Sequence, residues 1–498
     1  MTPNPVKFSD HPYDLLVVGG GINGAAVANV ACGEGLRVAL VEKGDFAGGT
    51  SSKSTKLIHG GLRYLEHFEF DLVKESLKER YIQLKNAPHL VRPLEFIIPV
   101  YQGDKRPLWM MRLGVWMYDL FCGKYLIQKH RGLRAKDVAA QLPGIKTEGL
   151  VGGVTYFDAQ MDDARLCLEN VLSARAKGAD VSNYVEAAAF IKVNGKVKGV
   201  VAKDLASGRT FKIHAKQVVC AVGPWTNSVL QMESGQPSGR IRTTKGVHVV
   251  YRQLLSSRAM LLQTRSDNRI FFVIPWMGHS LIGTTDTDDD SPADRVDVTP
   301  EDVEYLMSEL ARVFPDVQFK NEEIVTTFAG LRPLVREGGD PSQVSRRHII
   351  EETISGLVYV IGGKYTTYRR IAVDCVGRIL RHPIQKNEFD YPLFGSGEVH
   401  EASAVLAKEF GVPESTVEHL RNKYGSRLRD VLVLTRRDGR LKEWITHGAP
   451  DILAQVVYAR EVEMARTVED VIWRRLGLGY VIKDLELVQD RIKPYLTK

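Results

Sequence analysis

Residues 13–42 constrain the fold of this 498-residue chain more than any other stretch. An apolar strand is followed by glycines in the spacing G-x-G-x-x-G, then by a helix of small residues, and then by a second apolar strand that ends at Glu42. This order predicts a βαβ unit of the Rossmann type. A glycine-rich surface turn is the alternative, but it would explain neither the two flanking strands nor the acid at the end.

The glycines and the final acid each suit a bound dinucleotide. Gly19 permits a tight turn, Gly21 lets the backbone approach a pyrophosphate, and Gly24 permits close packing of the helix. The first turn of the helix offers free N–H groups and a positive dipole end to the phosphates. Glu42 lies roughly twenty residues further on, where an acid accepts hydrogen bonds from an adenosine ribose. The predicted nucleotide contacts are Gly19, Gly21, Ile22, Asn23, Gly24 and Glu42.

The glycine motif leaves NAD and FAD open as the nucleotide, and the segment after it favours FAD. Residues 50–66 read TSSKSTKLIHGGLRYLE. This run resembles the FAD-dependent glycerol-3-phosphate dehydrogenases, respiratory enzymes of the glycine oxidase and D-amino-acid oxidase superfamily. Tyr365 departs from the family pattern, which leads us to expect a small apolar residue there. Further blocks similar to the family follow in the same order, at residues 222–225, 245–248, 272–276, 282–286, 330–334 and 362–369.

The resemblance implies a cofactor, a substrate and an electron acceptor. It implies a flavoprotein that oxidises sn-glycerol 3-phosphate to dihydroxyacetone phosphate by hydride transfer to FAD and passes the electrons to membrane quinone. The strand at residues 218–223 would return beside the adenine half of FAD, so that the FAD-binding domain is discontinuous. The FAD contacts implied beyond the nucleotide motif are Thr50, Ser51, Ser52, Ser54, Lys56, Leu57, His59, Gly223, Trp225, Gly363, Lys364 and Thr366.

Oxidation of a secondary alcohol by a flavin needs a base for the hydroxyl proton and positive charge near the reduced ring. His59 and His248 are the candidates for the base, because imidazole titrates near neutral pH. The resemblance favours His59. Lys364, at the expected start of a helix, would stabilise negative charge on the ring.

A phosphate dianion calls for forked donors, which arginine provides and lysine does not. Arg63 stands next to Tyr64, and Arg332 is expected in a Gly-Leu-Arg-Pro turn. Surface ion pairs are the common role of arginine, but both lie in blocks similar to the family. We therefore expect Arg63, Tyr64, His248 and Arg332 to bind the substrate, and His59, Lys364 and Arg332 to act in catalysis.

Composition narrows the class of protein. The net charge of +7 suits an anionic substrate or membrane surface, although so mild an excess is commonly unremarkable. Five cysteines without a C-x-x-C pair indicate neither a disulfide framework nor a redox dithiol, and no metal site is expected. No second dinucleotide motif follows a strand, so electrons would leave the flavin without a separate NAD(P)H domain. The absence of a signal peptide and of a long apolar stretch predicts a cytoplasmic protein.

Residues 105–136 combine apolar and basic side chains. Tryptophans, methionines and other apolar residues crowd the segment from Pro107 to Phe121, and eight basic residues lie in or beside it. Such a helix is too short to span a membrane and is typical of an interfacial anchor. A buried helix under the substrate domain is the alternative, because aromatic stripes are commonly core. The anchor interpretation predicts peripheral attachment to the anionic inner face of the cell membrane, where quinone is available.

The expected architecture is α/β with three domains. Residues 12–92, 150–235 and 340–385 are assigned to a discontinuous, Rossmann-like FAD-binding domain, and residues 93–149 and 236–339 to an antiparallel-sheet substrate domain. Residues 390–498 are expected to form a helical domain, with helices at 401–410, 413–424, 451–465 and 468–476. Thr467 and Asp470 are predicted to cap the last of these helices.

Several alternatives stay open. An oxidase of the same family would pass electrons to oxygen, and an amine or amino-acid oxidase could share the fold. An FAD-dependent nucleic-acid-modifying protein is more remote, since no basic stripe with stacking aromatics lies outside residues 105–136, and no nucleic acid is expected. A non-catalytic protein of the membrane surface is a further alternative. The sequence leaves the oligomeric state open, a homodimer included.

Overall fold

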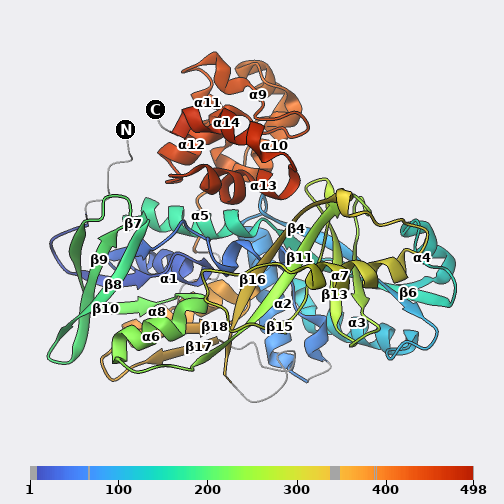
Figure 1. Ribbon diagram of the computed structural model, residues 1–498, viewed down its shortest axis with the longest axis horizontal. Coiled ribbons are helices and arrows are strands. Elements are labelled where there is room, and N and C mark those ends of the chain that lie inside the picture. Colours follow the sequence, from blue (N-terminus) through green and yellow to red (C-terminus); the bar gives the residue numbers. More distant parts are fainter. Residues whose placement is uncertain (1–7, 66–67, 337–347, 386, 388–389, 497–498) are drawn as a thin grey trace.

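The computed structural model describes residues 8–65, 68–336, 348–385, 387 and 390–496, except for the side chain of Arg63. Figure 1 shows two sheets beside each other, with a helical C-terminal domain above them. The expected α/β architecture is confirmed: a Rossmann-like sheet, a second and largely antiparallel sheet, and a C-terminal helical domain.

The first sheet has eight strands in the described part of the chain. Its centre runs β18-β10-β1-β2-β7 and is parallel throughout, while β17 pairs antiparallel with β18 and a β8–β9 hairpin extends from β10. The strands are β1 (Tyr13–Val18), β2 (Val38–Glu42), β7 (Asp180–Asn183), β8 (Val185–Val193), β9 (Lys196–Asp204), β10 (Thr210–Cys220), β17 (His348–Glu352) and β18 (Val358–Gly362). Strands β1, β2 and β18 are largely apolar, because helices and hairpin bury both of their faces.

Helix α1, which follows the glycine motif, is in contact with two other helices of the first sheet. It packs against both α5 and α8. These helices are α1 (Ile22–Gly33), α5 (Asp163–Ala176), α6 (Thr226–Ser234) and α8 (Tyr368–Leu380). The small residues of α1 allow this close packing, and nine of its twelve residues are buried.

The second sheet has ten strands in the described part, and its neighbours are antiparallel except for β12 and β4. Its strands are β3 (Leu57–Ile58), β4 (Val91–Tyr101), β5 (Arg131–Arg134), β6 (Leu150–Met161), β11 (Ile241–Arg252), β12 (Ala259–Gln263), β13 (Ile270–Trp276), β14 (His279–Gly283), β15 (Thr287–Asp288) and β16 (Ile324–Val335). Its helices are α2 (Phe70–Asn86), α3 (Leu108–Cys122), α4 (Ala135–Gln141) and α7 (Pro300–Val313). Strand β3 lies within the loop at residues 48–59, which we call the flavin loop because its sequence resembles that of the FAD-dependent family. This loop connects the two sheets.

Two local expectations for this sheet need correction. Arg332 lies in strand β16 and not in a turn, with Pro333 opposite Thr243 on β11. Among the described strands β16 pairs only with β11 and is therefore an edge strand. Proline is tolerated in such a strand because its missing N–H breaks no hydrogen bond of the sheet. Helix α7 was not predicted, although Thr299 and Asp302 form a reciprocal capping box with proline at the first position, a signal that the sequence contained.

The C-terminal domain has a hydrophobic core of its own. Its helices are α9 (Ser403–Phe410), α10 (Glu414–Tyr424), α11 (Leu428–Leu434), α12 (Leu453–Glu461), a π-helical segment (Asp470–Leu476), α13 (Leu478–Val481) and α14 (Leu485–Leu496). The predicted cap pair is confirmed, because Thr467 Oγ1 accepts from the backbone of Asp470 at 3.1 Å and Asp470 accepts in return at 3.0 Å. Among the described helices, none combines the length and the apolar character that crossing a membrane requires.

Candidate active site

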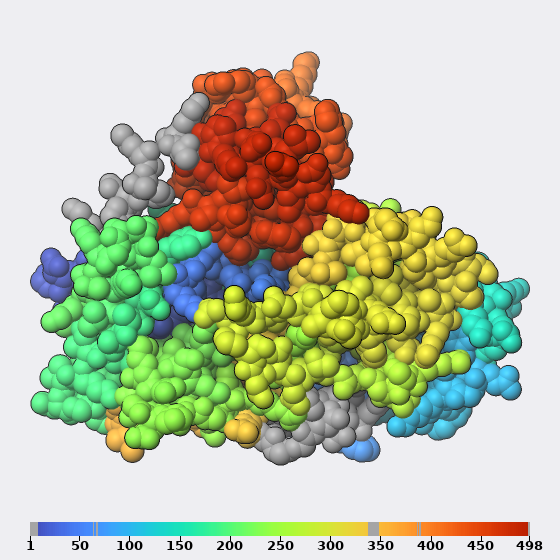
Figure 2. Space-filling model, viewed as in Figure 1, coloured from blue at the N-terminus to red at the C-terminus, as the bar shows by residue number. Residues whose placement is uncertain are grey.

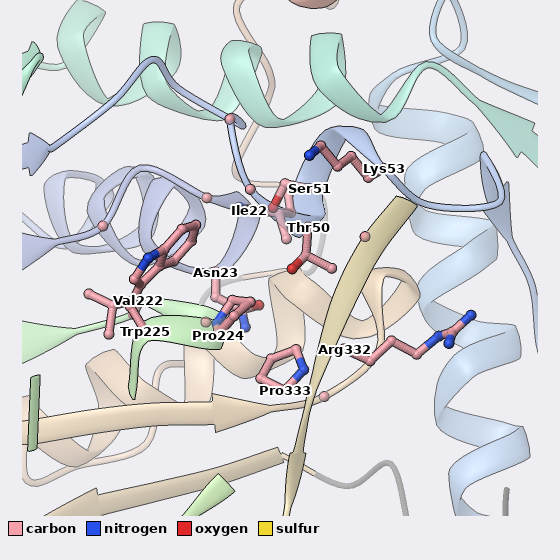
Figure 3. A pocket seen from close by; sticks show the side chains of 18 of the residues that line it. Ile22, Asn23, Thr50, Ser51, Lys53, Val222, Pro224, Trp225, Arg332 and Pro333 are labelled. Atoms are coloured by element: carbon pink, nitrogen blue, oxygen red, sulfur yellow. Dashed lines mark hydrogen bonds between the residues drawn. The ribbon is translucent and has the colours of Figure 1, made fainter. Parts of the chain in front are cut away.

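A cavity of about 650 Å³ lies where the two sheets meet. Both sheets contribute to its wall, together with the loop at residues 48–59 and the segment after β18. Figure 3 shows Trp225 and Arg332 on opposite sides of the view, with Asn23 and Thr50 between them. The predicted residues that line the cavity are Gly19, Gly21, Ile22, Asn23, Glu42, Thr50, Ser51, Ser54, Leu57, His59, Tyr64, Gly223, Trp225, His248, Arg332, Gly363, Lys364 and Thr366.

The glycines shape the nucleotide end of this cavity. A Cβ on Gly24 would lie 1.9 Å from the carbonyl oxygen of Gly19, so Gly24 serves the packing of α1 on β1 and does not line the cavity. A Cβ on Gly21 would point toward Ser51 Oγ, at 3.2 Å. That hydroxyl accepts from the N–H of Ile22 at 2.9 Å. The N-terminus of α1 therefore meets the cavity as bare backbone, a cradle that fits the pyrophosphate of the expected FAD.

Glu42 lies on the cavity wall at the end of β2. Its two carboxylate oxygens accept from the backbone N–H groups of Gly20 and Gly44, at 2.7 and 2.8 Å. Burial raises the pKa of Glu42, and the two backbone donors oppose that shift. The carboxylate is thus held in one orientation beside the nucleotide cradle, as a ribose contact requires.

Two residues at the nucleotide end were not predicted. Lys43 Nζ lies 2.7 Å from Asp294 Oδ1 and 4.3 Å from the centre of the Trp225 ring. The indole N–H of Trp225 donates to the same carboxylate at 3.1 Å. Asp294 belongs to the segment between β15 and α7, so this contact ties the second sheet's side of the cavity to the first. No local pattern could have indicated it, since its partners lie far apart in the sequence.

The loop at residues 48–59 is tied to both sheets. The hydroxyl of Thr50 donates to the backbone carbonyl of Leu331 on β16 at 2.6 Å, and that of Ser54 donates to Asp163 on α5 at 2.7 Å. Lys53 also lines the cavity, although it was not predicted as a site residue. Burial lowers its pKa, and the nearby Arg474 lowers it further.

Ser52 and Lys56 do not line the cavity, unlike the other residues predicted in this loop. The ammonium group of Lys56 is buried and donates to Asp163 Oδ1 and to the carbonyl of Ser52, both at 2.6 Å. The hydroxyl of Tyr365, the residue that departs from the family pattern, donates to the backbone carbonyl of Asp163 at 2.5 Å. Asp163 therefore joins the flavin loop to the segment after β18.

Both candidate bases line the cavity. The ring of His248 is buried and stacks on Phe328 at 4.9 Å, and its Nε2 lies 3.0 Å from the hydroxyl of Thr55. Its Nδ1 is buried without a hydrogen-bond partner among the described residues. Burial, followed by the charges of Arg332 and Lys56, lowers its pKa well below 6.5, so the ring is neutral at neutral pH.

His59 is held through its backbone. Its N–H donates to the hydroxyl of Thr366 at 3.1 Å, and that hydroxyl lies 3.2 Å from its carbonyl oxygen. Lys364, two residues before Thr366 in the chain, is also buried. Its ammonium nitrogen lies 3.6 Å from the centre of the Tyr64 ring and 3.2 Å from the hydroxyl of Ser76. A histidine and a lysine thus share one wall of the cavity.

The guanidinium of Arg332 is held by side chains of its own sheet. Its Nη1 lies 3.0 Å from Asp286 Oδ1, and its Nη2 donates to the hydroxyl of Thr284 at 2.9 Å. A Cβ on Gly246, diagonally across on β11, would lie 2.3 Å from Nη2. Gly246 therefore makes room for the guanidinium. It lies in the block at residues 245–248 that resembles the family, but it was not predicted as a site residue. The side chain of Arg63, the other predicted phosphate ligand, lies outside the described residues.

Two family models match successive parts of the chain. The family described as FAD dependent oxidoreductase matches residues 14–369, and the C-terminal domain of alpha-glycerophosphate oxidase matches residues 389–494. A glycerol-3-phosphate dehydrogenase of Synechocystis sp. is 38% identical, over 96% of this chain and 91% of that protein. An aerobic glycerol-3-phosphate dehydrogenase of Staphylococcus aureus is 37% identical, over 96% of this chain and 89% of that protein.

Solved structures show the same similarity. The glycerol-3-phosphate dehydrogenase from Bacillus halodurans, complexed with FAD, superposes with a TM-score of 0.81 at 32% identity, over 98% of this chain and 91% of that chain. The L-alpha-glycerophosphate oxidase from Mycoplasma pneumoniae has a TM-score of 0.59 at 18% identity, over 76% of this chain and 98% of that chain, and shares the fold.

Proposed function

Because the chain belongs to the FAD-dependent oxidoreductases and, within them, to the glycerol-3-phosphate dehydrogenases, we propose that it oxidises sn-glycerol 3-phosphate to dihydroxyacetone phosphate. The cofactor is FAD. The observation that carries the substrate proposal is that one cavity contains the nucleotide cradle together with a neutral imidazole, a buried lysine and an arginine fork. These are His248, Lys364 and Arg332.

Each of these side chains has a part in the proposed reaction. The chemistry that FAD supplies when bound is acceptance of the hydride from the alcohol carbon. Lys364 places a positive charge where negative charge develops during this transfer. Arg332, oriented by Asp286 and Thr284, binds the phosphate dianion, and Arg63 is the second proposed phosphate ligand.

The proton of the substrate hydroxyl needs a base. His59 is the base that the family resemblance favours. His248 is the second candidate, because its ring is neutral at neutral pH and its buried Nδ1 lacks a hydrogen-bond partner among the described residues. A neutral imidazole accepts a proton without first losing one, which is what a general base at neutral pH requires.

Anaerobic addition of glycerol 3-phosphate to the purified yellow protein tests the proposed function. The flavin absorption band should bleach with glycerol 3-phosphate and stay unchanged with glycerol, which lacks the phosphate. Bleaching by glycine or proline in place of glycerol 3-phosphate would assign the protein to the amine or amino-acid oxidases. A band that none of these compounds bleaches contradicts the proposal.

We further propose that the electrons pass to quinone at a membrane surface. Helix α3 exposes much of its apolar face: Trp109, Trp116 and Leu120 are 65%, 52% and 63% exposed. Its buried residues are Val115, Tyr118 and Cys122, which are too few for a core helix. Figure 1 places α3 at the lower edge of the view, away from the C-terminal domain.

The surroundings of α3 support the same proposal. Phe68 is 77% exposed and its ring lies 5.9 Å from that of Phe70, which in turn contacts Phe121 of α3 at 5.3 Å. An exposed apolar patch of this kind marks a surface for a membrane or a partner. Not all neighbouring basic residues contribute, because Arg131 is paired with Glu95 and Arg134 with Asp137. The apolar residues are therefore expected to supply most of the affinity.

A further inference from the structure

The C-terminal domain reaches the flavin loop through α13. Figure 2 shows this domain, in red, seated over the blue N-terminal segment and against the yellow segment of the second sheet. Tyr480 of α13 is buried, and its hydroxyl donates to the backbone carbonyl of Ser52 at 3.0 Å. The same carbonyl accepts from Lys56 Nζ at 2.6 Å. The carbonyl of Ser52 thus accepts one hydrogen bond from its own loop and one from the C-terminal domain.

The ammonium group of Lys56 is enclosed by side chains from all three domains. The ring centres of Trp276 on β13, Phe328 on β16 and Tyr480 on α13 lie 5.3, 5.4 and 4.8 Å from its Nζ. Asp163 on α5 provides the opposite charge at 2.6 Å. Because Lys56 is only 1% exposed, water does not screen these contacts. The loop is held here by contacts from α5, the second sheet and the C-terminal domain together.

A chain of aromatic contacts leads from the C-terminal domain to the cavity. The ring of Tyr480 meets that of Phe328 edge to face at 5.1 Å, and Phe328 stacks on His248 at 4.9 Å with an interplanar angle of 14°. His248 in turn lies 3.0 Å from the hydroxyl of Thr55, in the flavin loop. Tyr480 thus reaches the flavin loop by two routes: through Phe328 and His248, and directly through its hydrogen bond to Ser52.

Two further groups of ion pairs hold the C-terminal domain against the rest of the protein. Arg475 contacts the carboxylate of Asp45 with two nitrogens, at 2.7 and 2.8 Å, and Arg474 contacts it at 2.5 Å. Glu463 pairs with Arg165 of α5 at 2.5 Å. Tyr480 therefore belongs to an interface that buried ion pairs hold together, which allows it to hold the position of the loop.

We propose that Tyr480 is a positioning residue for the FAD site. From the C-terminal domain it fixes residues 52–57 of the flavin loop through Ser52 and Lys56, and it fixes the plane of the His248 ring through Phe328. The site is consequently incomplete without the C-terminal domain. The role of Tyr480 in holding the loop depends only on FAD binding, whereas its role in turnover through His248 rests on the proposed function.

The test compares Tyr480 with a matched tyrosine of the same domain. Tyr458 of α12 is equally buried, at 3% against 4% exposure, and it contacts Tyr424 within the C-terminal core. The variants Tyr480→Ala and Tyr458→Ala, with Tyr480→Phe and Tyr458→Phe, are made in the full-length protein loaded with FAD. Thermal unfolding of each variant reports the general loss of stability.

The first readout is release of FAD, which needs no substrate. Tyr480→Ala should release FAD at least about tenfold faster than the wild type and alter the visible circular dichroism of the flavin, because a cavity opens beside the loop. Tyr480→Phe should release it about threefold faster, since one neutral hydrogen bond is lost. The two Tyr458 variants should release FAD at the wild-type rate, whatever their thermal stability.

The second readout is flavin reduction by glycerol 3-phosphate. In Tyr480→Ala the reduction rate should fall with little change in KM, and by about a hundredfold if His248 is the base, because a displaced base slows the chemical step more than binding. If wild-type protein is not reduced by this substrate, the proposed function fails, and FAD release still decides the role of Tyr480. If Tyr480→Ala does not fold, Tyr480→Phe decides it. Equal FAD release in the Tyr480 and Tyr458 variants overturns the proposal.

Discussion

Arg332 on β16 and Gly246 on β11 are diagonal neighbours, since Arg332 pairs with Thr244 and Gly246 with Gly330. The guanidinium occupies the space that a side chain at position 246 would fill. A Cβ there would lie 2.3 Å from Nη2. The glycine thus fixes where the arginine fork sits in the cavity. Substitution of Gly246 therefore tests the phosphate-binding proposal while Arg332 itself stays unchanged.

Gly246→Ala should displace the guanidinium and raise the KM for glycerol 3-phosphate by about tenfold, the scale of one charge-assisted hydrogen bond. Arg332→Lys should raise it at least as much, because a fork is replaced by a point charge. Both variants should retain FAD. Gly439→Ala is the control, since a Cβ there meets nothing within 4 Å. An unchanged KM in Gly246→Ala would remove Arg332 from the phosphate site.

The base is identified by comparing two histidines. We expect His59→Asn to keep FAD and substrate binding while flavin reduction slows by about a hundredfold, the usual scale for a general base. Rapid-reaction measurement of flavin bleaching gives this rate directly. The same loss in His248→Asn, with His59→Asn unaffected, would assign the base to His248.

The pH profile separates the same two candidates. Burial and the charges of Arg332 and Lys56 lower the pKa of His248 well below 6.5, so the neutral form persists to lower pH than usual. If His248 is the base, the reduction rate should stay constant as the pH falls through 6.5 and decline only below it. A decline already centred near pH 6.5 would exclude His248 as the base.

Asp45 carries a prediction about stability. Burial opposes its ionisation, but Arg475 and Arg474 outweigh that effect and lower its pKa from 3.8 to about 2. Because the folded-state pKa is the lower one, the stabilisation is present above pH 3.8 and is lost as the pH falls toward 2. Asp45→Asn should lower the free energy of unfolding at pH 7 by about 3 kcal/mol or more, since the buried Arg475 and the partly buried Arg474 lose the carboxylate that they share.

Denaturant unfolding, followed by circular dichroism, measures this change. The control is Asp490→Asn, which removes an exposed pair with Lys493 and should leave the unfolding free energy unchanged within error. Equal effects of the two substitutions would mean that the pair with Arg475 contributes nothing to docking of the C-terminal domain.

Membrane attachment is tested on the exposed face of α3. Replacing Trp109 and Trp116 by serine should weaken binding to anionic liposomes, while reaction with a water-soluble dye continues. Leu487→Ser removes an apolar side chain that is 70% exposed on the C-terminal domain and should leave liposome binding unchanged. Faster reoxidation by a quinone analogue than by oxygen is expected. Fast reaction with oxygen, without liposome binding, would favour the oxidase alternative.

Features encoded by neighbouring residues could be predicted from the sequence alone. The βαβ unit, helix α2 at Phe70–Asn86 and the reciprocal cap of Thr467 with Asp470 all appear in the structure where the sequence placed them. Each depends on periodicity, on glycine or on bonds over three or four residues, and such features are fixed by local stereochemistry. Most of the predicted site residues line the cavity, and the family resemblance of their blocks indicated them, whereas Lys43, Lys53 and Asp294 were missed.

Tertiary structure alone decided which side chains of those blocks face the cavity and which hold the domains together. Lys56 stands in the same run as Ser51 and His59, yet its ammonium group is enclosed by Asp163 and three aromatic rings. Tyr480 touches the flavin loop from more than four hundred residues away in the chain. Such contacts depend on how separate domains dock, and docking is set by buried charge and shape that no local pattern of residues contains.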